Sequence, residues 1–162
     1  MATDFDFGRG ELWMFGIIVG THGEFANGIL ESCEMILGED TVKKGIRAVT
    51  LKRGEGPDNV IEKYKAAIAD LGNPDRILFL NDLRGGTPYN AASTLAIADE
   101  KYGIVAGVNF PMLIAMAQEQ MVDDGTEDIK SIMQKAIDAG KEGVIPTTYD
   151  DLNTPAGDED DL

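Results

Sequence analysis

Four short and almost continuous apolar runs alternate with helical patterns along this chain, and that alternation constrains the fold more than any other feature. The runs are FGIIV (15–19), IRAVTL (46–51), RILFL (76–80) and IVAGV (104–108). Strands that are buried on both faces have such runs, because parallel sheets carry helices on both sides. The sequence therefore predicts an α/β fold with an open, mainly parallel, four-stranded sheet and helices on both faces.

Apolar residues at helical spacing in the intervening segments predict the helices. A first helix at about 24–37 is expected to turn one stripe inward: Phe25, Ile29, Cys33 and Ile36. A second helix should end at Gly72 and bury its own stripe: Ile61, Tyr64, Ile68 and Leu71. Prolines suited to a first helical turn open two more helices, at Pro88 with Thr87 as its N-cap and at Pro111. A fifth helix is indicated by its stripe: Ile129, Ile132, Met133, Ala136 and Ile137.

The chain is expected to form one domain with a short segment at each end. Residues 1–13 are expected to be a leader or expression arm, because apolar structure starts directly after Met14. Residues 14–149 form the domain, and 150–162 are expected to be an acidic, disordered tail. The segment GVIPTTY (143–149) is predicted to be a C-terminal edge strand, since Pro146 excludes a central position in a sheet.

Composition excludes several classes of function. The formal net charge is −15, and no cluster of Lys and Arg is present, which argues against nucleic-acid binding. One cysteine and one histidine exclude an intramolecular disulfide and a zinc site of the Cys/His type, so no metal or cofactor is expected, although a carboxylate-only magnesium site stays open. Because no apolar run approaches the length of a membrane-spanning helix, we expect a cytoplasmic protein.

Two loops are expected at the carboxyl edge of the sheet, where α/β proteins place their sites. G-T-H-G (20–23) follows the first strand, and N-D-L-R-G-G-T-P-Y-N (81–90) follows the third. If these strands are neighbours, His22 and Asp82 form a pair. The carboxylate would then fix the tautomer of the imidazole and stabilise the positive charge that forms when Nε2 acts as a nucleophile.

The glycines of the second loop suggest what the histidine attacks. Gly85, Gly86 and Thr87 precede an expected helix N-terminus, where free N–H groups and the helix dipole favour a phosphate. The combination predicts a histidine that itself becomes phosphorylated. A plain turn followed by a helix cap is the alternative reading of RGGTP.

Three motifs carry a resemblance to a known family. VGTHGEFANGILESCEMILG (19–38), FLNDLRGGTPYNAA (79–92) and VAGVNFPML (105–113) resemble the enzyme IIA component, mannose family, of the bacterial phosphoenolpyruvate:sugar phosphotransferase system. The resemblance implies that His22 accepts a phosphoryl group at Nε2 from phospho-HPr and passes it to a histidine of a IIB partner. It also implies that Asp82 orients His22, with Gly86 and Thr87 in the phosphate-contacting turn. Arg84 stands where relatives are expected to have an apolar or aromatic residue, and it either reaches the phosphoryl group or stays solvated.

The same resemblance implies partners and assembly. The IIB subunit is expected to be a separate polypeptide, with indirect association to membrane IIC and IID subunits for sugar uptake. A homodimer is expected, in which the C-terminal strand is exchanged. Two alternative functions stay open: a phosphotransfer subunit that feeds dihydroxyacetone kinase, and a non-enzymatic regulator that is read by its phosphorylation state.

Overall fold

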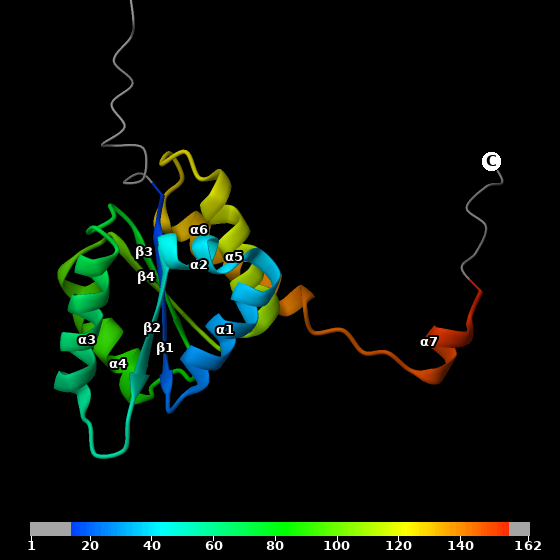
Figure 1. Cartoon of the computed structure of the whole chain (residues 1–162), viewed down its shortest axis with the longest axis horizontal. Coiled ribbons are helices and arrows are strands. Elements are labelled where there is room, and N and C mark those ends of the chain that lie inside the picture. Colours follow the sequence, from blue (N-terminus) through cyan, green and yellow to red (C-terminus); the bar gives the residue numbers. More distant parts are fainter. Residues whose placement is uncertain (1–13, 156–162) are drawn as a thin grey trace, which may run out of the picture.

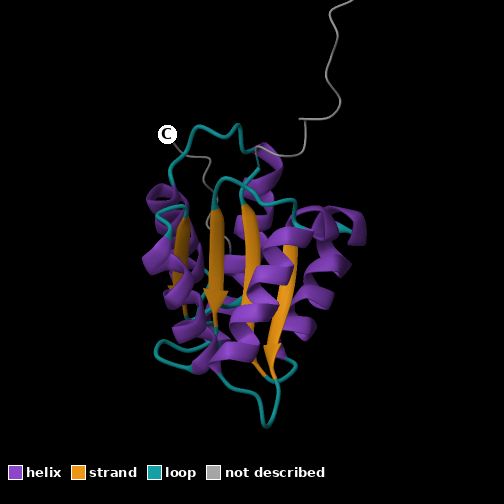
Figure 2. Ribbon diagram, turned by 90° about the vertical axis from the view of Figure 1, so that its left-hand side faces the viewer, coloured by secondary structure: helices purple, strands orange, loops and turns teal. Residues whose placement is uncertain are grey.

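The computed structural model describes residues 14–155, so the predicted leader at 1–13 and the last part of the predicted tail lie outside the described residues. Four parallel strands form one sheet in the order β2-β1-β3-β4. Their bounds are β1 Gly16–His22, β2 Ile46–Leu51, β3 Ile77–Asn81 and β4 Tyr102–Ala106. The predicted four-stranded sheet is confirmed (Figure 2), and in its strand order β1 lies between β2 and β3.

Helices cover both faces of the sheet, as Figure 1 shows. Five main helices and one shorter helix pack on it: α1 Phe25–Leu37, α2 Glu39–Gly45, α3 Pro57–Asp70, α4 Thr87–Ala98, α5 Phe110–Val122 and α6 Ile129–Glu142. One apolar cluster joins the sheet to α1, α2, α5 and α6, and the other joins it to α3 and α4. In β1, Ile17 and Val19 belong to the first cluster and Ile18 to the second, so both strand faces are buried. None of the described helices combines the length and apolarity needed to cross a membrane.

Helix α1 has the predicted length but a different inward face. Its buried side chains are Ala26, Ile29, Leu30 and Cys33. Phe25 and Ile36, which were expected to point inward, are 47% and 61% exposed. The helical spacing was right, but the helix is rotated, because small Ala26 permits a closer approach to the sheet than a phenyl ring would allow.

The segment after α6 differs from the expected edge strand. Residues 143–148 form no strand within this chain, and a short helix that the sequence pattern did not predict, α7 Tyr149–Asn153, occupies the beginning of the expected tail. Thr148 caps α7, since its side chain accepts a hydrogen bond from the Asp151 N–H. The segment extends away from the body of the molecule (Figure 1), and Val144 and Ile145 are 74% and 75% exposed. We call residues 143–153 the C-terminal arm.

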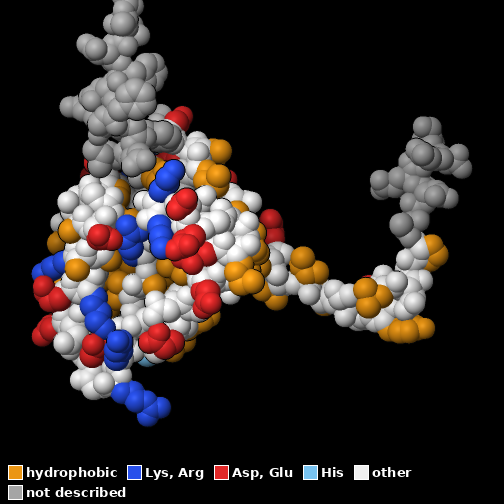
Figure 3. Space-filling view, in the orientation of Figure 1, with side chains coloured by type: hydrophobic (Ala, Val, Ile, Leu, Met, Phe, Trp, Pro, Cys, Tyr) orange, Lys and Arg blue, Asp and Glu red, His pale blue; other side chains and the backbone are white. Residues whose placement is uncertain are grey.

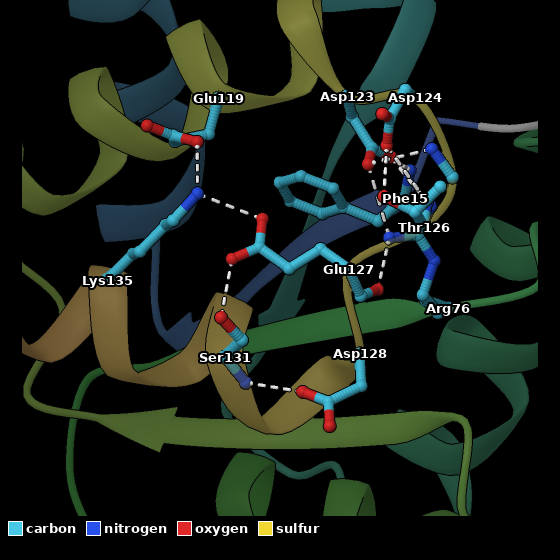
Figure 4. Close-up of polar contacts among 11 residues, drawn as sticks. Phe15, Arg76, Glu119, Asp123, Asp124, Thr126, Glu127, Asp128, Ser131 and Lys135 are labelled. Atoms are coloured by element: carbon cyan, nitrogen blue, oxygen red, sulfur yellow. Dashed lines mark hydrogen bonds and ion pairs between the residues drawn. The ribbon is translucent and has the colours of Figure 1, made fainter.

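A polar clamp holds the beginning of β1 at the amino ends of the strands (Figure 4). The Phe15 N–H donates to Asp123 Oδ2 over 2.9 Å, and Arg76 Nη2 pairs with the same oxygen at 2.7 Å. Arg76 also donates to the Glu127 carbonyl, and so it links the end of α5 to the start of α6. Both side chains of the ion pair are largely buried, so the clamp lies within the protein at the end of the sheet opposite the loops described next.

Candidate functional site

The two loops singled out in the sequence meet at the carboxyl ends of adjacent strands. Gly20 of β1 is paired with Asn81 of β3, and His22 and Asp82 follow these two residues within one or two positions. Thr21 is buried, and its hydroxyl accepts a hydrogen bond from the Ala26 N–H at the beginning of α1. The strand pairing and this contact together fix the backbone on both sides of His22.

The predicted pair of His22 and Asp82 forms. Asp82 Oδ2 lies 2.9 Å from Nδ1 of the His22 ring and also accepts the His22 backbone N–H at 2.9 Å. The other carboxylate oxygen accepts the Leu83 N–H. Because an ionised carboxylate only accepts hydrogen bonds, this contact places the ring proton on Nδ1 and leaves the lone pair of Nε2 available.

The pair is accessible from solvent. The side chain of His22 is 46% exposed, whereas that of Asp82 is 17% exposed. Figure 3 shows Lys and Arg side chains interspersed with Asp and Glu side chains on the face that it draws, including its lower end. A reactive nitrogen on an open surface suits exchange with another macromolecule better than enclosure of a small substrate.

The glycine turn before α4 packs directly against the imidazole. A Cβ atom at Gly86 would lie 2.7 Å from His22 Cε1 and 3.3 Å from Nε2, so only glycine fits there without moving the ring. Gly85 has a φ of 80°, a left-handed conformation that glycine adopts without strain. The Asn90 side chain donates to the Gly85 carbonyl and closes the turn. This turn brings the N-terminus of α4 beside Nε2.

The structure corrects the predicted role of Thr87 as a helix cap. Gly86 is the N-cap of α4, and Thr87 is the first helical residue. The Thr87 N–H and hydroxyl find no protein partner among the described residues, as is normal for the first N–H groups of a helix. Thr87 therefore presents two donors at the same end of α4 as Gly86. Arg84, in the same loop, is exposed and makes no hydrogen bond or ion pair within residues 14–155.

A buried polar network lies under the site, and the sequence analysis missed it. Asn81 Nδ2 donates to the Gly20 carbonyl at 2.8 Å and to the Tyr64 hydroxyl at 2.9 Å. The Tyr64 hydroxyl in turn donates to the Pro88 carbonyl at 3.0 Å. Sequence reasoning placed Tyr64 in an apolar stripe; the available signal was Asn81, a polar residue that ends an otherwise apolar strand.

Other candidate groups do not join the site. Cys33 is fully buried, and this burial raises the pKa of its thiol, in agreement with its predicted role as a small apolar residue of the core. Within residues 14–155, no group of three or more His, Cys, Asp and Glu residues is placed to hold a metal ion.

Comparisons with known proteins identify a family model and several relatives. A family model described as PTS system fructose IIA component, EIIA-man, matches residues 16–133. The PTS system mannose-specific EIIAB component of Escherichia coli (strain K12) is 38% identical over 128 residues, which cover 79% of this chain and 38% of that protein. The chain thus spans well under half the length of this relative.

Two further proteins match over most of their own length. The PTS system fructose-specific EIIA component of Bacillus subtilis (strain 168) is 34% identical over 126 residues, which cover 76% of this chain and 84% of that protein. The crystal structure of phosphotransferase system component EIIA from Streptococcus agalactiae superposes with a TM-score of 0.70 at 27% identity. That alignment covers 82% of this chain and 97% of the other.

Proposed function

The chain belongs to the mannose-type EIIA family of the phosphotransferase system, and from this premise we propose that His22 is its phosphoryl-carrying residue. The proposed cycle takes place in the cytoplasm. Phospho-HPr donates a phosphoryl group to Nε2 of His22, and a IIB subunit accepts it for sugar uptake through membrane subunits. The observation that carries this proposal is the His22–Asp82 pair, whose free Nε2 lies against the N-terminus of α4.

The geometry supports each part of the transfer. The lone pair of Nε2 attacks phosphorus, the N–P bond of the donor breaks, and the donor imidazole leaves with the bonding electrons. The His22 ring becomes positively charged while its proton stays on Nδ1, and the Asp82 carboxylate at 2.9 Å stabilises that charge. Transfer to IIB runs through the same steps in reverse.

The surrounding turn can stabilise the phosphoryl group. The Thr87 N–H and hydroxyl are unpaired donors, and the positive end of the α4 dipole points to the same place. Gly86 lets the phosphoryl group and the backbone come close together, because it has no side chain. Arg84 is exposed in the same loop, and its guanidinium is a further candidate to bind the phosphoryl oxygens.

Phosphorylation of variants tests the assignment of His22. The protein is incubated with phosphoenolpyruvate, enzyme I and HPr, and the intact mass is measured. The unmodified chain should gain one phosphoryl group that is labile in acid and stable in base, and His22→Gln should gain none. Glu24→Gln, a change in the same loop away from the pair, is the control. An acid-labile phosphate on His22→Gln would refute the assignment.

Two further measurements separate the roles in the cycle. Asp82→Asn should accept the phosphoryl group substantially more slowly, because an amide cannot stabilise the imidazolium and can present the wrong partner to Nδ1. The phosphorylated chain should lose its phosphoryl group when a IIB subunit is added. Retention of the phosphoryl group in the presence of IIB would instead favour a regulator that is read by its phosphorylation state.

We also propose that two copies associate through the C-terminal arm. The two edges of the sheet differ in a way that supports this. On β2, the outward-facing carbonyls of Ile46 and Thr50 accept hydrogen bonds from the side chains of Arg47, at 2.9 Å, and Lys63, at 2.8 Å. On β4, the outward-facing backbone groups of Ile104 and Ala106 have no such partner among the described residues. The β4 edge is therefore the one that can accept another strand.

The arm has the properties of such a strand. Val144 lines a groove of about 270 Å³ at the end of β4, which is lined also by Met112 and Ile137, and the side chains of Val144 and Ile145 are both exposed. Pro146 has no N–H, so pairing would stop there. Reciprocal exchange between two copies would cover both arms and both β4 edges in one closed dimer.

A further inference from the structure

Two buried polar side chains outside the reactive pair link the segments that carry it. Tyr64 of α3 and Asn81 of β3 are both fully buried. They bond to each other at 2.9 Å, and each reaches one backbone carbonyl: Asn81 that of Gly20, and Tyr64 that of Pro88. We call Tyr64 and Asn81 the buried link.

Each contact of the buried link lies next to a residue of the site. Gly20 precedes His22 by two positions, Asn81 directly precedes Asp82, and Pro88 directly follows Thr87. The buried link therefore joins the backbones of the nucleophile, the orienting carboxylate and the phosphate-contacting turn. Gly20 makes this possible, because a Cβ atom there would lie only 1.9 Å from the Tyr64 hydroxyl.

Packing alone does not account for an amide at position 81. Asn81 Oδ1 is buried and has no hydrogen-bond partner, a state that is unfavourable for folding. The other residues of β3 are apolar, and an aliphatic side chain of similar size would avoid the unpaired acceptor. Rotating the amide would turn its oxygen toward the Gly20 carbonyl, so the present orientation is the one that gives that carbonyl a donor.

We propose that Tyr64 and Asn81 are positioning residues, which hold His22 Nε2, Asp82 and the N-terminus of α4 in the arrangement that phosphoryl transfer needs. This inference rests on the proposed function. Neither side chain touches the phosphoryl group; both act through the backbones that they fix. Transfer between two imidazoles requires alignment of the attacking nitrogen, the phosphorus and the leaving nitrogen, and small displacements reduce the rate steeply.

The test compares two tyrosines that pack on the same ring. Tyr64 and Tyr102 both make edge-to-face contacts with Phe79, at centroid distances of 4.9 Å and 5.7 Å, but only the Tyr64 hydroxyl joins the buried link. Tyr64→Phe should lower the rate of phosphorylation at saturating phospho-HPr by about tenfold. The concentration of phospho-HPr for half-maximal rate should stay unchanged, because the docking surface is intact. Tyr102→Phe should keep the rate of the unmodified protein.

Asn81→Leu provides a second variant, in which two effects on stability oppose each other. It removes the unpaired Oδ1 but also takes the donor from the Gly20 carbonyl, so the urea midpoint should change little, while phosphorylation slows by about tenfold or more. A purely structural role would lower the midpoint and the rate together. Unchanged phosphorylation in both Tyr64→Phe and Asn81→Leu would overturn the proposal.

A spectroscopic measurement separates failure of this inference from failure of the proposed function. The ring nitrogens of His22, the single histidine, are followed by ¹⁵N NMR without any phosphoryl donor. Tyr64→Phe and Asn81→Leu should shift the ring toward a mixture of tautomers, and Tyr102→Phe should not. Unaltered His22 signals in both variants would contradict the positioning role even if the protein were never phosphorylated. A protein that is not phosphorylated but shows the predicted signals would overturn only the proposed function.

Discussion

Replacing Gly86 with alanine adds one methyl group directly beside the His22 ring. The φ of Gly86, −71°, suits any residue, so Gly86→Ala causes no backbone strain, but the new Cβ would lie 2.7 Å from His22 Cε1. The ring must move away from Asp82 or from α4. We expect a folded protein whose phosphorylation rate falls by at least about tenfold, measured with purified phospho-HPr.

Gly28→Ala is the matched control for that prediction. Gly28 lies within α1 in an ordinary helical conformation, and apart from its chain neighbours and the backbone of its own helix no described atom lies within 4 Å of the position of its Cβ. Alanine should stabilise the protein by about 0.5–1 kcal/mol and leave phosphorylation unchanged. Equal rates for Gly86→Ala and Gly28→Ala would show that the ring has room at the turn.

Tyr64 should make the stability of the protein fall at alkaline pH. Burial is the main cause that raises the pKa of its phenol well above the ordinary value of 10.0. In the unfolded chain the phenol loses its proton near pH 10, whereas in the folded protein it retains it. The contribution of the Tyr64 phenol to the free energy of unfolding is therefore complete below about pH 10 and is lost as the pH rises above that value.

Urea unfolding at about pH 8 and at about pH 11 measures this effect. The loss of stability between the two should be smaller for Tyr64→Phe than for the unmodified protein. Tyr149→Phe, which alters a ring that is 78% exposed on α7, is the control and should behave as the unmodified protein does. An equal loss for Tyr64→Phe would show that the Tyr64 phenol does not contribute.

Among the elements, the beginning of β1 depends most on a single ion pair. Asp123→Ala would take the Asp123 carboxylate away from the largely buried Arg76 guanidinium and leave the Phe15 N–H without its acceptor. We expect the free energy of unfolding to fall by about 3–5 kcal/mol, measured by urea denaturation. Phosphorylation at temperatures where the variant is folded should persist, since the clamp lies at the opposite end of the sheet.

Asp124→Ala is the neighbouring control. The Asp124 side chain is exposed, and among residues 14–155 only Thr126, in the same turn, donates hydrogen bonds to it, so its loss should cost less than about 1 kcal/mol. If Asp123→Ala and Asp124→Ala lowered the free energy of unfolding by similar amounts, the ion pair of Arg76 and Asp123 would contribute no more than the hydrogen bonds of the turn.

Strands and helices with a clear apolar pattern could be predicted from the sequence, and very short elements could not. The strands were predictable because each is a run of apolar residues bounded by polar loops. Helix α2 was not, since Glu39–Gly45 has only seven residues and buries only Val42 and Gly45. The spacing of apolar residues in α1 predicted a helix but not which of its faces is buried, because that depends on the sheet that it packs against.

The part of the site that lies directly at the ends of strands could be predicted from the sequence. His22 and Asp82 could be paired from the sequence because parallel strands bring their carboxyl ends to one edge. The contacts that support them could not, because Tyr64 and Asn81 are 17 positions apart and Arg76 and Asp123 are 47 apart. No local pattern specifies which distant polar groups will meet inside a core.

At the scale of the whole molecule, the C-terminal arm determines the predicted assembly. The full chain should be a dimer by light scattering, and a chain that ends after Gly143 should be a monomer with an intact α6, which ends at Glu142. A chain that ends after Thr154 retains the arm and is the control, which should stay dimeric. A dimer that persists after truncation at Gly143 would place the interface elsewhere and leave residues 144–153 without a role in association.

The capped β2 edge has a consequence for how large an assembly can become. If both edges of the sheet were open, the β4 side of one copy could add to the β2 side of the next, and repetition would build an endless ribbon. Arg47 and Lys63 occupy carbonyls that such a ribbon would need. Pairing of β4 with β2 is then disfavoured, so the proposed exchange of arms would end at a closed pair and would not extend into a filament.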